Sequence, residues 1–308
     1  MHEINLELSA SQLKAADQCF ISWAFTYLYG LRSPSKPYQV FGKLIHACLE
    51  SYAITGNVYK PDIDGELSND LSALTDVNRS RFLKEAPPRA LNATRLLPDL
   101  SQCRRWPEEV FTFNSSQYFT GPDLSWSPRS KIDLIVNSGS RWLVTDYKST
   151  RGKRVSKSDA RELGIEPGFH PWFYVPTAAE LRNDVQFILY ALAVMQAADV
   201  TEIEGRWIYI LTDEKHSPRS ESVDVTVTLD EMIEAGKRWI ELGHCITQWK
   251  LASKQHGPPS LDHLKRNLPV VVYPEPKSPC MQYGGCMHHV TKKGKCDAGM
   301  DAASLLGG

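Results

Sequence analysis

The strongest constraint on the fold is a pair of neighbouring segments, RSKIDLIV and RWLVTDYK, that are rich in β-branched and aromatic residues. Only the sequence NSGS separates them, and its composition is typical of a hairpin turn. We therefore predict two antiparallel strands. A turn centred near Ser138 and Gly139 puts Asp133 across from the segment Val144 to Asp146, so that two carboxylates converge.

The second strand carries a charged pair, because Asp146 and Lys148 are two positions apart and point to the same face. Such a triplet alone is weak evidence, since roughly one is expected by chance in a chain of this length. Its context strengthens it, because an aspartate between apolar strand residues, like Asp133, is either paired or used. Two carboxylates facing one point suit Mg²⁺ or Mn²⁺, and a lysine beside the cation could stabilise charge on a phosphate. This combination predicts hydrolysis of phosphodiester bonds.

Helical periodicity marks the rest of the chain. Apolar residues at helical spacing predict helices over Ser9 to Tyr29, Val40 to Ile54, Thr177 to Ala198 and Leu229 to Leu251, and a further strand begins at Arg206. The stretch from Gly56 to Pro107 has weaker signals and is interpreted as an accessory helical insertion.

Five sequence motifs occur in the order found in one nuclease family: LSASQLKAADQC, GKLIHACLE, KIDLIV, TDYKST and QFILY. On these motifs the chain resembles the RecB-like branch of the PD-(D/E)XK nucleases. It is most similar to the iron-sulfur members, such as the AddB nuclease domain and the CRISPR-associated Cas-four type. The resemblance covers about Ser9 to Cys296, apart from Gly56 to Pro107. It implies an α/β fold with a restriction-endonuclease-like core, in which helices flank a mixed central sheet.

The resemblance also implies roles for individual residues. Asp133, Asp146 and Lys148 would be catalytic, and the metal ligands would be His46, Asp133, Asp146 and the backbone carbonyl of Tyr147. A single helical histidine is usually structural, but the GxxxH motif ahead of the hairpin favours the metal role. Gln186 and Tyr190 share a helical face and would either contact DNA or orient the catalytic residues, although the same spacing also fits an ordinary buried stripe.

Seven cysteines are present, and three of them lie in the C-terminal tail CMQYGGCMHHVTKKGKC. By the resemblance, Cys19 joins Cys280, Cys286 and Cys296 to hold a structural [4Fe-4S] cluster. Because the spacing departs from that of many relatives, a zinc site with His288 or His289 as the fourth ligand is an alternative. Cys48, Cys103 and Cys245 are interpreted as plain small residues.

The formal net charge is −1, so DNA binding depends on local basic surface. Arg151, Lys153 and Arg154 open a basic loop that is followed by aromatic residues, and this loop could guide a single strand by charge and base stacking. A plain hydrated loop is the alternative. The N-terminal sequence has no basic stretch followed by an apolar one, and no apolar run is long enough to span a bilayer, so we expect a cytoplasmic location and no membrane partner.

Together these features predict three consecutive parts: an N-terminal helical region (1–107), a nuclease core (108–255) and a cysteine-rich tail (256–308). The expected function is a metal-dependent DNA exonuclease that prefers single strands or free ends. Protein partners in recombination, repair, CRISPR adaptation or phage DNA metabolism are expected with it. The alternative is a non-catalytic DNA-binding or partner-docking protein on the same fold.

Overall fold

The computed structural model of the chain describes residues 6–31, 36–58, 70, 74–113, 115–119, 126–150, 153–155, 157, 161, 168–170, 175–212, 217–260 and 263. The chain divides into two compact units. The terminal unit comprises Met1–Ser33, Asn114–Arg129 and Gly236–Gly308, and the sheet unit comprises Pro34–Phe113 and Ser130–Ala235. The three consecutive parts expected from the sequence (1–107, 108–255 and 256–308) stay a prediction.

The sheet unit contains a mixed sheet in the order β3–β4–β7–β8, with β2 also paired to β3. Its strands are β2 (Arg104–Thr112), β3 (Trp126–Asn137, from Ser130 onward), β4 (Trp142–Thr150), β7 (Glu202–Leu211) and β8 (Ser220–Thr228). β4 runs antiparallel to β3 and parallel to β7, and β8 runs antiparallel to β7. The predicted α/β fold with a mixed sheet is therefore confirmed.

The predicted β3–β4 hairpin forms at the NSGS sequence. The side chain of Asn137 accepts a hydrogen bond from the N–H of Gly139 and donates one to its carbonyl, both at 3.1 Å. Gly139 has a φ of +90°, which a residue without a side chain adopts at little cost. The register pairs Leu134 with Thr145 and Ile135 with Val144, so Asp133 lies opposite the expected part of β4.

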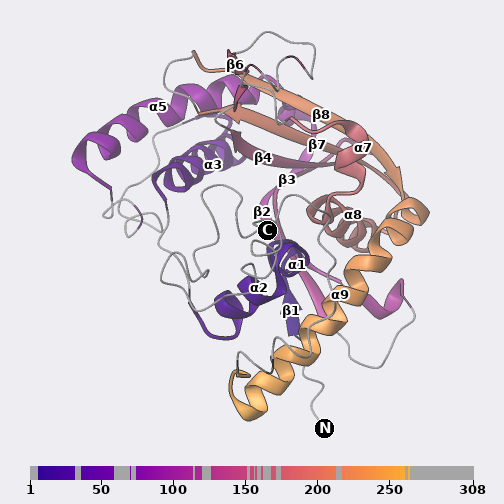
Figure 1. The fold of residues 1–308 in the computed structure, drawn as a ribbon. Coiled ribbons are helices and arrows are strands. Elements are labelled where there is room, and N and C mark those ends of the chain that lie inside the picture. Colours follow the sequence, from indigo (N-terminus) through magenta and orange to yellow (C-terminus); the bar gives the residue numbers. More distant parts are fainter. Residues whose placement is uncertain are drawn as a thin grey trace. The chain divides into compact units, whose positions relative to one another are not determined.

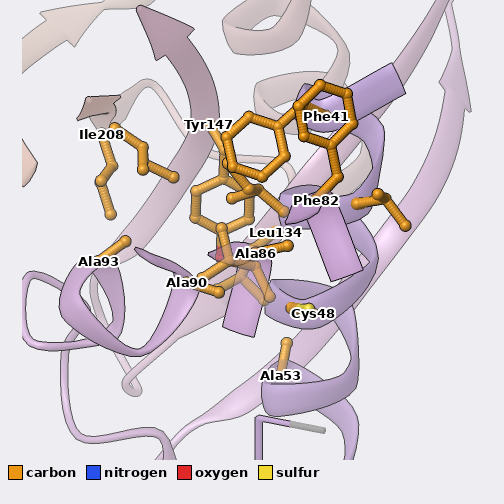
Figure 2. Close-up of a cluster of buried hydrophobic side chains, with 14 of the residues drawn as sticks. Phe41, Cys48, Ala53, Phe82, Ala86, Ala90, Ala93, Leu134, Tyr147 and Ile208 are labelled. Atoms are coloured by element: carbon orange, nitrogen blue, oxygen red, sulfur yellow. The ribbon is translucent and has the colours of Figure 1, made fainter. Parts of the chain in front are cut away.

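Helices cover both faces of this sheet. Helices α3 (Pro37–Thr55) and α5 (Asp76–Thr94) lie side by side in Figure 1 and enclose the core drawn in Figure 2, to which Ile208 of β7 belongs. The neighbouring residue Trp207 instead meets Phe187 of helix α8 (Val185–Ala198), with ring centroids 5.2 Å apart. Because successive strand residues point to opposite faces, α8 packs on the other face of the sheet.

Two long predicted helices are each interrupted. The segment Ser9 to Tyr29 forms α1 (Ala10–Gln18) and α2 (Phe20–Tyr27), so the prediction of one helix was wrong at Cys19. Cys19 is extended, with a φ of −163°, and its sulfur accepts a hydrogen bond from the N–H of Ser22 at 3.4 Å, which begins the second helix. The capping interaction thus replaces a continuous backbone ladder.

The second interruption lies between α7 (Ala178–Arg182) and α8, within the segment predicted as one helix from Thr177 to Ala198. Asp184 is extended, and its carboxylate accepts a hydrogen bond from the N–H of Gln186 at 2.8 Å. This N-cap starts α8 anew, and it places Gln186 in the first helical turn.

The terminal unit is described by itself. It contains β1 (Leu6–Leu8), α1, α2, the short helix η2 (Ser115–Gln117), the start of β3, and α9 (Leu229–His256) from Gly236 onward. β1 runs parallel to Trp126–Pro128 of β3. Gly243 of α9 lies so close to the buried indole of Trp126 that any side chain there would overlap the ring. Within the described ranges, no helix is long and apolar enough to cross a bilayer.

Three further elements of the sheet unit lie among its described residues. The short helix η1 (Leu100–Gln102) precedes β2, and strands β5 (Lys153–Val155) and β6 (Gly168–His170) form a separate antiparallel pair. These two strands lie in the basic and aromatic segment for which the sequence predicts a loop. Much of that segment is outside the described residues.

Candidate active site

A pocket of about 650 Å³ lies in the sheet unit, where α3 faces β2, β3 and β4. Its lining residues are Gln39, Gly42, Lys43, His46, Ala47, Glu50, Asp70, Glu108, Lys131, Asp133, Tyr147, Lys148 and Ser149. Residues predicted from the helical GxxxH motif and from the hairpin therefore meet in one pocket.

His46 reaches the hairpin because α3 approaches β4 closely. Gly42 lies one helical turn before His46, and a Cβ atom at Gly42 would lie 2.8 Å from the Oγ atom of Ser149 on β4. His46 Nδ1 lies 3.5 Å from Asp133 Oδ1, and the rings of His46 and Tyr147 meet edge to face with centroids 5.7 Å apart. The spatial meeting of the helix histidine and the strand aspartate, predicted from the sequence, is present.

His46 and Asp133 stabilise each other's charged forms. Burial lowers the pKa of His46, but the charge of Asp133 and the hydrogen bond with it outweigh this effect, so the pKa is raised overall. Burial raises the pKa of Asp133, but the charge of His46, its hydrogen bond and the N–H of Tyr147 together lower it overall. That N–H donates to Asp133 Oδ2 at 2.7 Å. The carboxylate of Asp133 is thus ionised, and His46 and the N–H of Tyr147 fix its position.

Asp146 and Lys148 form the second charged pair. Asp146 is only 2% exposed, and burial raises the pKa of its carboxyl to about 6 even though the charge of Lys148 acts in the opposite direction. The Nζ atom of Lys148 lies 2.5 Å from Asp146 Oδ2. Burial lowers the pKa of Lys148, but the charge and hydrogen bond of Asp146 outweigh it and raise the pKa overall. The two side chains share a face of β4, as their spacing predicts.

Gln186 and Tyr190 of α8 connect to this pair. Gln186 accepts a hydrogen bond from Lys148 Nζ at 2.7 Å and donates to Asp146 Oδ1 at 2.8 Å. Its amide also donates to the hydroxyl of Tyr190 at 2.6 Å, and that hydroxyl donates to the carbonyl of Lys131 at 2.6 Å. Of the two roles left open by the sequence, this geometry favours orientation of Asp146 and Lys148.

A candidate cation-binding group consists of His46, Glu108 and Asp133, each of which offers one ligand atom within 4.8 Å of the other two. Imidazole nitrogen and carboxylate oxygen suit a divalent cation. Opposite ligands of such an ion lie about 4.2 to 4.8 Å apart for metal–oxygen distances of about 2.1 to 2.4 Å, so the donor set and spacing fit. Asp146 is not part of this group, and its carboxylate contacts Lys148 and Gln186. Its role as a metal ligand, and that of the Tyr147 carbonyl, stay predictions.

Sequence reasoning missed Glu108. The residue lies in β2 at a φ of +54°, a left-handed conformation that is uncommon for a residue with a side chain, and it forms an ion pair with Lys131. The one local signal is an acidic pair, Glu108 and Glu109, directly after Pro107 and followed by the apolar residues Val110 and Phe111. No periodicity relates that pair to the hairpin, because β2 comes close to it only through tertiary pairing.

Several predicted site residues are described in part or not at all. Arg151, Cys280, Cys286 and Cys296 lie outside the described residues, as do the alternative zinc ligands His288 and His289. For Lys153 and Arg154, only the backbone pairing in β5 with His170 and Phe169 is described. Cys19 is half-buried between α1 and α2. Of the four predicted cluster ligands, Cys19 is thus the one within the described part of the chain.

Family comparison adds an independent observation to this geometry. Residues 7–254 match the model of the PD-(D/E)XK nuclease superfamily. The chain belongs to this superfamily. The matched range includes His46, the β3–β4 hairpin and α8, so the PD-(D/E)XK resemblance drawn from the motifs is confirmed at the level of the superfamily. The RecB-like branch and its iron-sulfur cluster stay predictions.

Among solved structures, the chain is similar to a protein named "Putative exonuclease" from Eubacterium rectale. The two share 13% sequence identity with a TM-score of 0.46, over 91% of this chain and 94% of that one. A search among curated proteins gives no match. The superfamily assignment depends on the family match and not on this distant similarity.

Proposed function

We propose that the protein is a Mg²⁺- or Mn²⁺-dependent deoxyribonuclease that acts as an exonuclease and prefers single-stranded DNA. Membership of the PD-(D/E)XK nuclease superfamily supports the hydrolase class. The observation that carries the proposal is the hydrogen-bonded set of Lys148, Asp146 and Gln186 beside the group of His46, Glu108 and Asp133. A lysine held next to cation ligands can stabilise the negative charge that develops on a phosphate during phosphodiester hydrolysis.

Each of these side chains has its own role in the proposed hydrolysis. Lys148 keeps its positive charge and projects into the pocket, where its ammonium can stabilise negative charge on a phosphate or orient an attacking water. Asp146 and Gln186 hold that ammonium in place from two sides. His46, Glu108 and Asp133 would hold the cation, with Asp146 and the carbonyl of Tyr147 as further predicted ligands. When bound, Mg²⁺ or Mn²⁺ supplies Lewis acidity toward the phosphate oxygens.

The test is cleavage of end-labelled single- and double-stranded DNA with Mn²⁺ or Mg²⁺ by the wild type, Asp146→Asn and Lys148→Met. We expect kcat to fall by about 10² to 10³ in each variant, because both remove transition-state stabilisation. Asp224→Asn is the matched control: this exposed carboxylate also pairs with a cation, Arg206, at 2.8 Å. It should retain wild-type activity.

A wild type that cleaves nothing with either cation, or an Asp146→Asn variant that cleaves as fast as wild type, would overturn the proposal. The first result, if DNA is still bound, would favour the alternative of a non-catalytic DNA-binding or partner-docking protein. A ladder of products shortened from one end supports exonuclease action, whereas internal fragments from circular DNA contradict it.

The single-strand preference is supported only by the sequence of the basic loop. If Arg151, Lys153 and Arg154 guide a strand, replacing all three with methionine should weaken single-strand affinity and reduce its salt dependence by about 0.7 in log–log slope per lost contact. Unchanged binding would remove this role. Cytoplasmic location and protein partners in recombination, repair, CRISPR adaptation or phage DNA metabolism stay predictions.

We further propose that Cys19, Cys280, Cys286 and Cys296 hold a structural [4Fe-4S] cluster. The support is the number of thiolates in the sequence and the position of Cys19 at a helix break, where the sulfur sits at the start of α2. Protein purified without oxygen should be brown and contain about four irons per chain, and Cys19→Ser should lose both properties. Cys103→Ser is the control. Zinc in place of iron would favour the alternative site with His288 or His289.

A further inference from the structure

The ion pair between Glu108 and Lys131 joins the cation-binding group to a second positive charge in the same pocket. Lys131 precedes Asp133 by two positions on β3, so both side chains project from the same face, about 6.6 to 6.8 Å apart along the strand. Glu108 pairs with Lys131, and a carboxylate oxygen of Glu108 lies within 4.8 Å of the ligand atoms of His46 and Asp133. One carboxylate therefore faces both an ammonium and a cation position.

The two side chains of this ion pair differ in their exposure to solvent. The side chain of Lys131 is 58% exposed, whereas that of Glu108 is 16% exposed. The backbone of Lys131 is held, because its carbonyl accepts the hydrogen bond from Tyr190 at 2.6 Å. Because Lys131 is mostly exposed, water can solvate its ammonium when it leaves Glu108, and a cation beside Glu108 would keep the partly buried carboxylate paired.

A divalent cation beside Glu108 would weaken the ion pair between Glu108 and Lys131. It attracts the carboxylate more strongly than a single ammonium does, and it repels the ammonium of Lys131 at short range. The displaced ammonium remains at the pocket, where a DNA phosphate close to the cation would attract it. Lysine commonly acts as a point charge for phosphate.

We propose that Glu108 is a cation ligand and that Lys131 is a phosphate-binding residue which Glu108 releases when the cation binds. Cation binding and DNA binding are thereby coupled through one exchanged carboxylate. This inference rests on the proposed nuclease function and adds a regulatory step to the same site: the pocket takes a phosphodiester strand well only when the cation is present.

The chain offers a matched control for Lys131. Lys43 lines the same pocket, has a similarly exposed side chain at 50%, and also forms an ion pair, but with Asp70. Among the described residues, Asp70 is not part of the cation-binding group. Lys43 should therefore contribute to DNA affinity to the same degree with and without cation.

The experiment measures binding of a fluorescent single-stranded oligonucleotide by anisotropy, in Ca²⁺ and in EDTA, across a salt series. Ca²⁺ uses the same oxygen ligands, and a gel checks that the oligonucleotide stays intact. We expect Lys131→Met to lose affinity about 3- to 10-fold in Ca²⁺ and less than about 2-fold in EDTA, with one phosphate contact (about 0.7 in log–log slope) lost only in Ca²⁺. Lys43→Met should lose the same factor in both buffers.

Glu108→Gln tests the other half of the exchange. It should raise DNA affinity in EDTA, because Lys131 is no longer held, and the double variant with Lys131→Met should abolish that gain. Calorimetry without DNA should show Ca²⁺ affinity lowered about tenfold or more in Glu108→Gln, because loss of a ligand should cost at least as much as loss of a partner that only supports one. Lys131→Met should leave Ca²⁺ affinity the same or higher.

The exchange is overturned if Lys131→Met lowers DNA affinity by the same factor in Ca²⁺ and in EDTA, or if it leaves DNA affinity unchanged in both. It is also overturned if Glu108→Gln binds Ca²⁺ as tightly as wild type does. Circular dichroism verifies that each variant is folded. These outcomes are distinct from failure of the nuclease proposal, because they are read from binding without turnover. The protein could therefore cleave DNA, and lose that activity in Asp146→Asn, while the binding measurements overturn the exchange between Glu108 and Lys131.

Discussion

At the scale of single residues, the amide of Gln186 links the two charged side chains of the TDYK segment. Its oxygen accepts from Lys148 and its nitrogen donates to Asp146, so both are restrained by one uncharged group. An amide can do this because it carries a donor and an acceptor on the same carbon. Gln186 is therefore a positioning residue, and it is distinguishable from a DNA contact by kinetics.

For Gln186→Leu we predict a kcat lower by about 10- to 100-fold, the range seen when partners of metal-site residues are removed, with KM for DNA nearly unchanged. The reason is that the variant misplaces Lys148 but removes no substrate contact. Gln196→Leu, later in the same helix, is the control and should be close to wild type. A raised KM at unchanged kcat would instead assign Gln186 to DNA binding.

The raised pKa of Asp146 predicts a pH dependence. Its carboxyl is neutral below about pH 6 and ionised above it, and only the ionised form attracts a cation. At low Mg²⁺, kcat/KM should therefore fall about tenfold per pH unit below about pH 6. Because the cation competes with the proton, higher Mg²⁺ should move this acid limb to lower pH. The prediction is contradicted if kcat/KM falls at the same pH at low and at high Mg²⁺ concentration.

At the scale of elements, α3 comes close to β4 at Gly42, one helical turn before His46, which contacts Asp133 on the neighbouring strand β3. Gly42 permits the approach, since its Cβ would lie 2.8 Å from the hydroxyl oxygen of Ser149 and at an ordinary 3.5 Å from the Cβ atom of Ser149. The obstacle is thus a single oxygen atom. This makes the contact testable by a pair of substitutions.

Gly42→Ala should weaken Mn²⁺ affinity, and Ser149→Ala in the same chain should restore it, with a coupling energy of about 1 kcal/mol, within the range for residues in contact. Ser149→Ala alone should be near neutral. Thermal stability is a poor measure here, because alanine gains up to about 1 kcal/mol over glycine in a helix and offsets the clash. Mn²⁺ titration of all four proteins checks the prediction, and equal affinities would contradict it.

The breaks at Cys19 and at Asp184 show how elements depart from periodicity. In both segments the apolar spacing is helical on each side of the break. A side chain that accepts a hydrogen bond from a backbone N–H three or two positions later starts a new helix. Capping competes with the continuous ladder, and hydrophobic spacing carries no information about that competition.

At the scale of the whole molecule, a cation at His46, Glu108 and Asp133 would join α3, β2 and β3. A ligand that binds only the folded chain stabilises it by about 2.7 kcal/mol at 100 times its Kd. We therefore predict that Mg²⁺ or Mn²⁺ raises the Tm of wild type, that EDTA reverses the shift, and that Asp133→Asn nearly abolishes it. Scanning calorimetry checks this. A full shift in Asp133→Asn would contradict binding at this group.

The sequence alone was sufficient for the α/β class, for the β3–β4 hairpin, for Asp146 and Lys148 sharing a face, and for a helix that carries His46 toward Asp133. The hairpin, the shared face and the helix around His46 follow from periods of 2 and 3.6 and from turn composition, which act over a few neighbouring residues. The α/β class and the meeting of His46 with Asp133 followed from the resemblance of the motifs to the PD-(D/E)XK nucleases. Glu108, the bridging position of Gln186 and the ion pair of Lys131 were decided by tertiary structure. Each depends on strands and helices that are distant in the chain packing against one another, and short-range pattern does not encode which of them become neighbours.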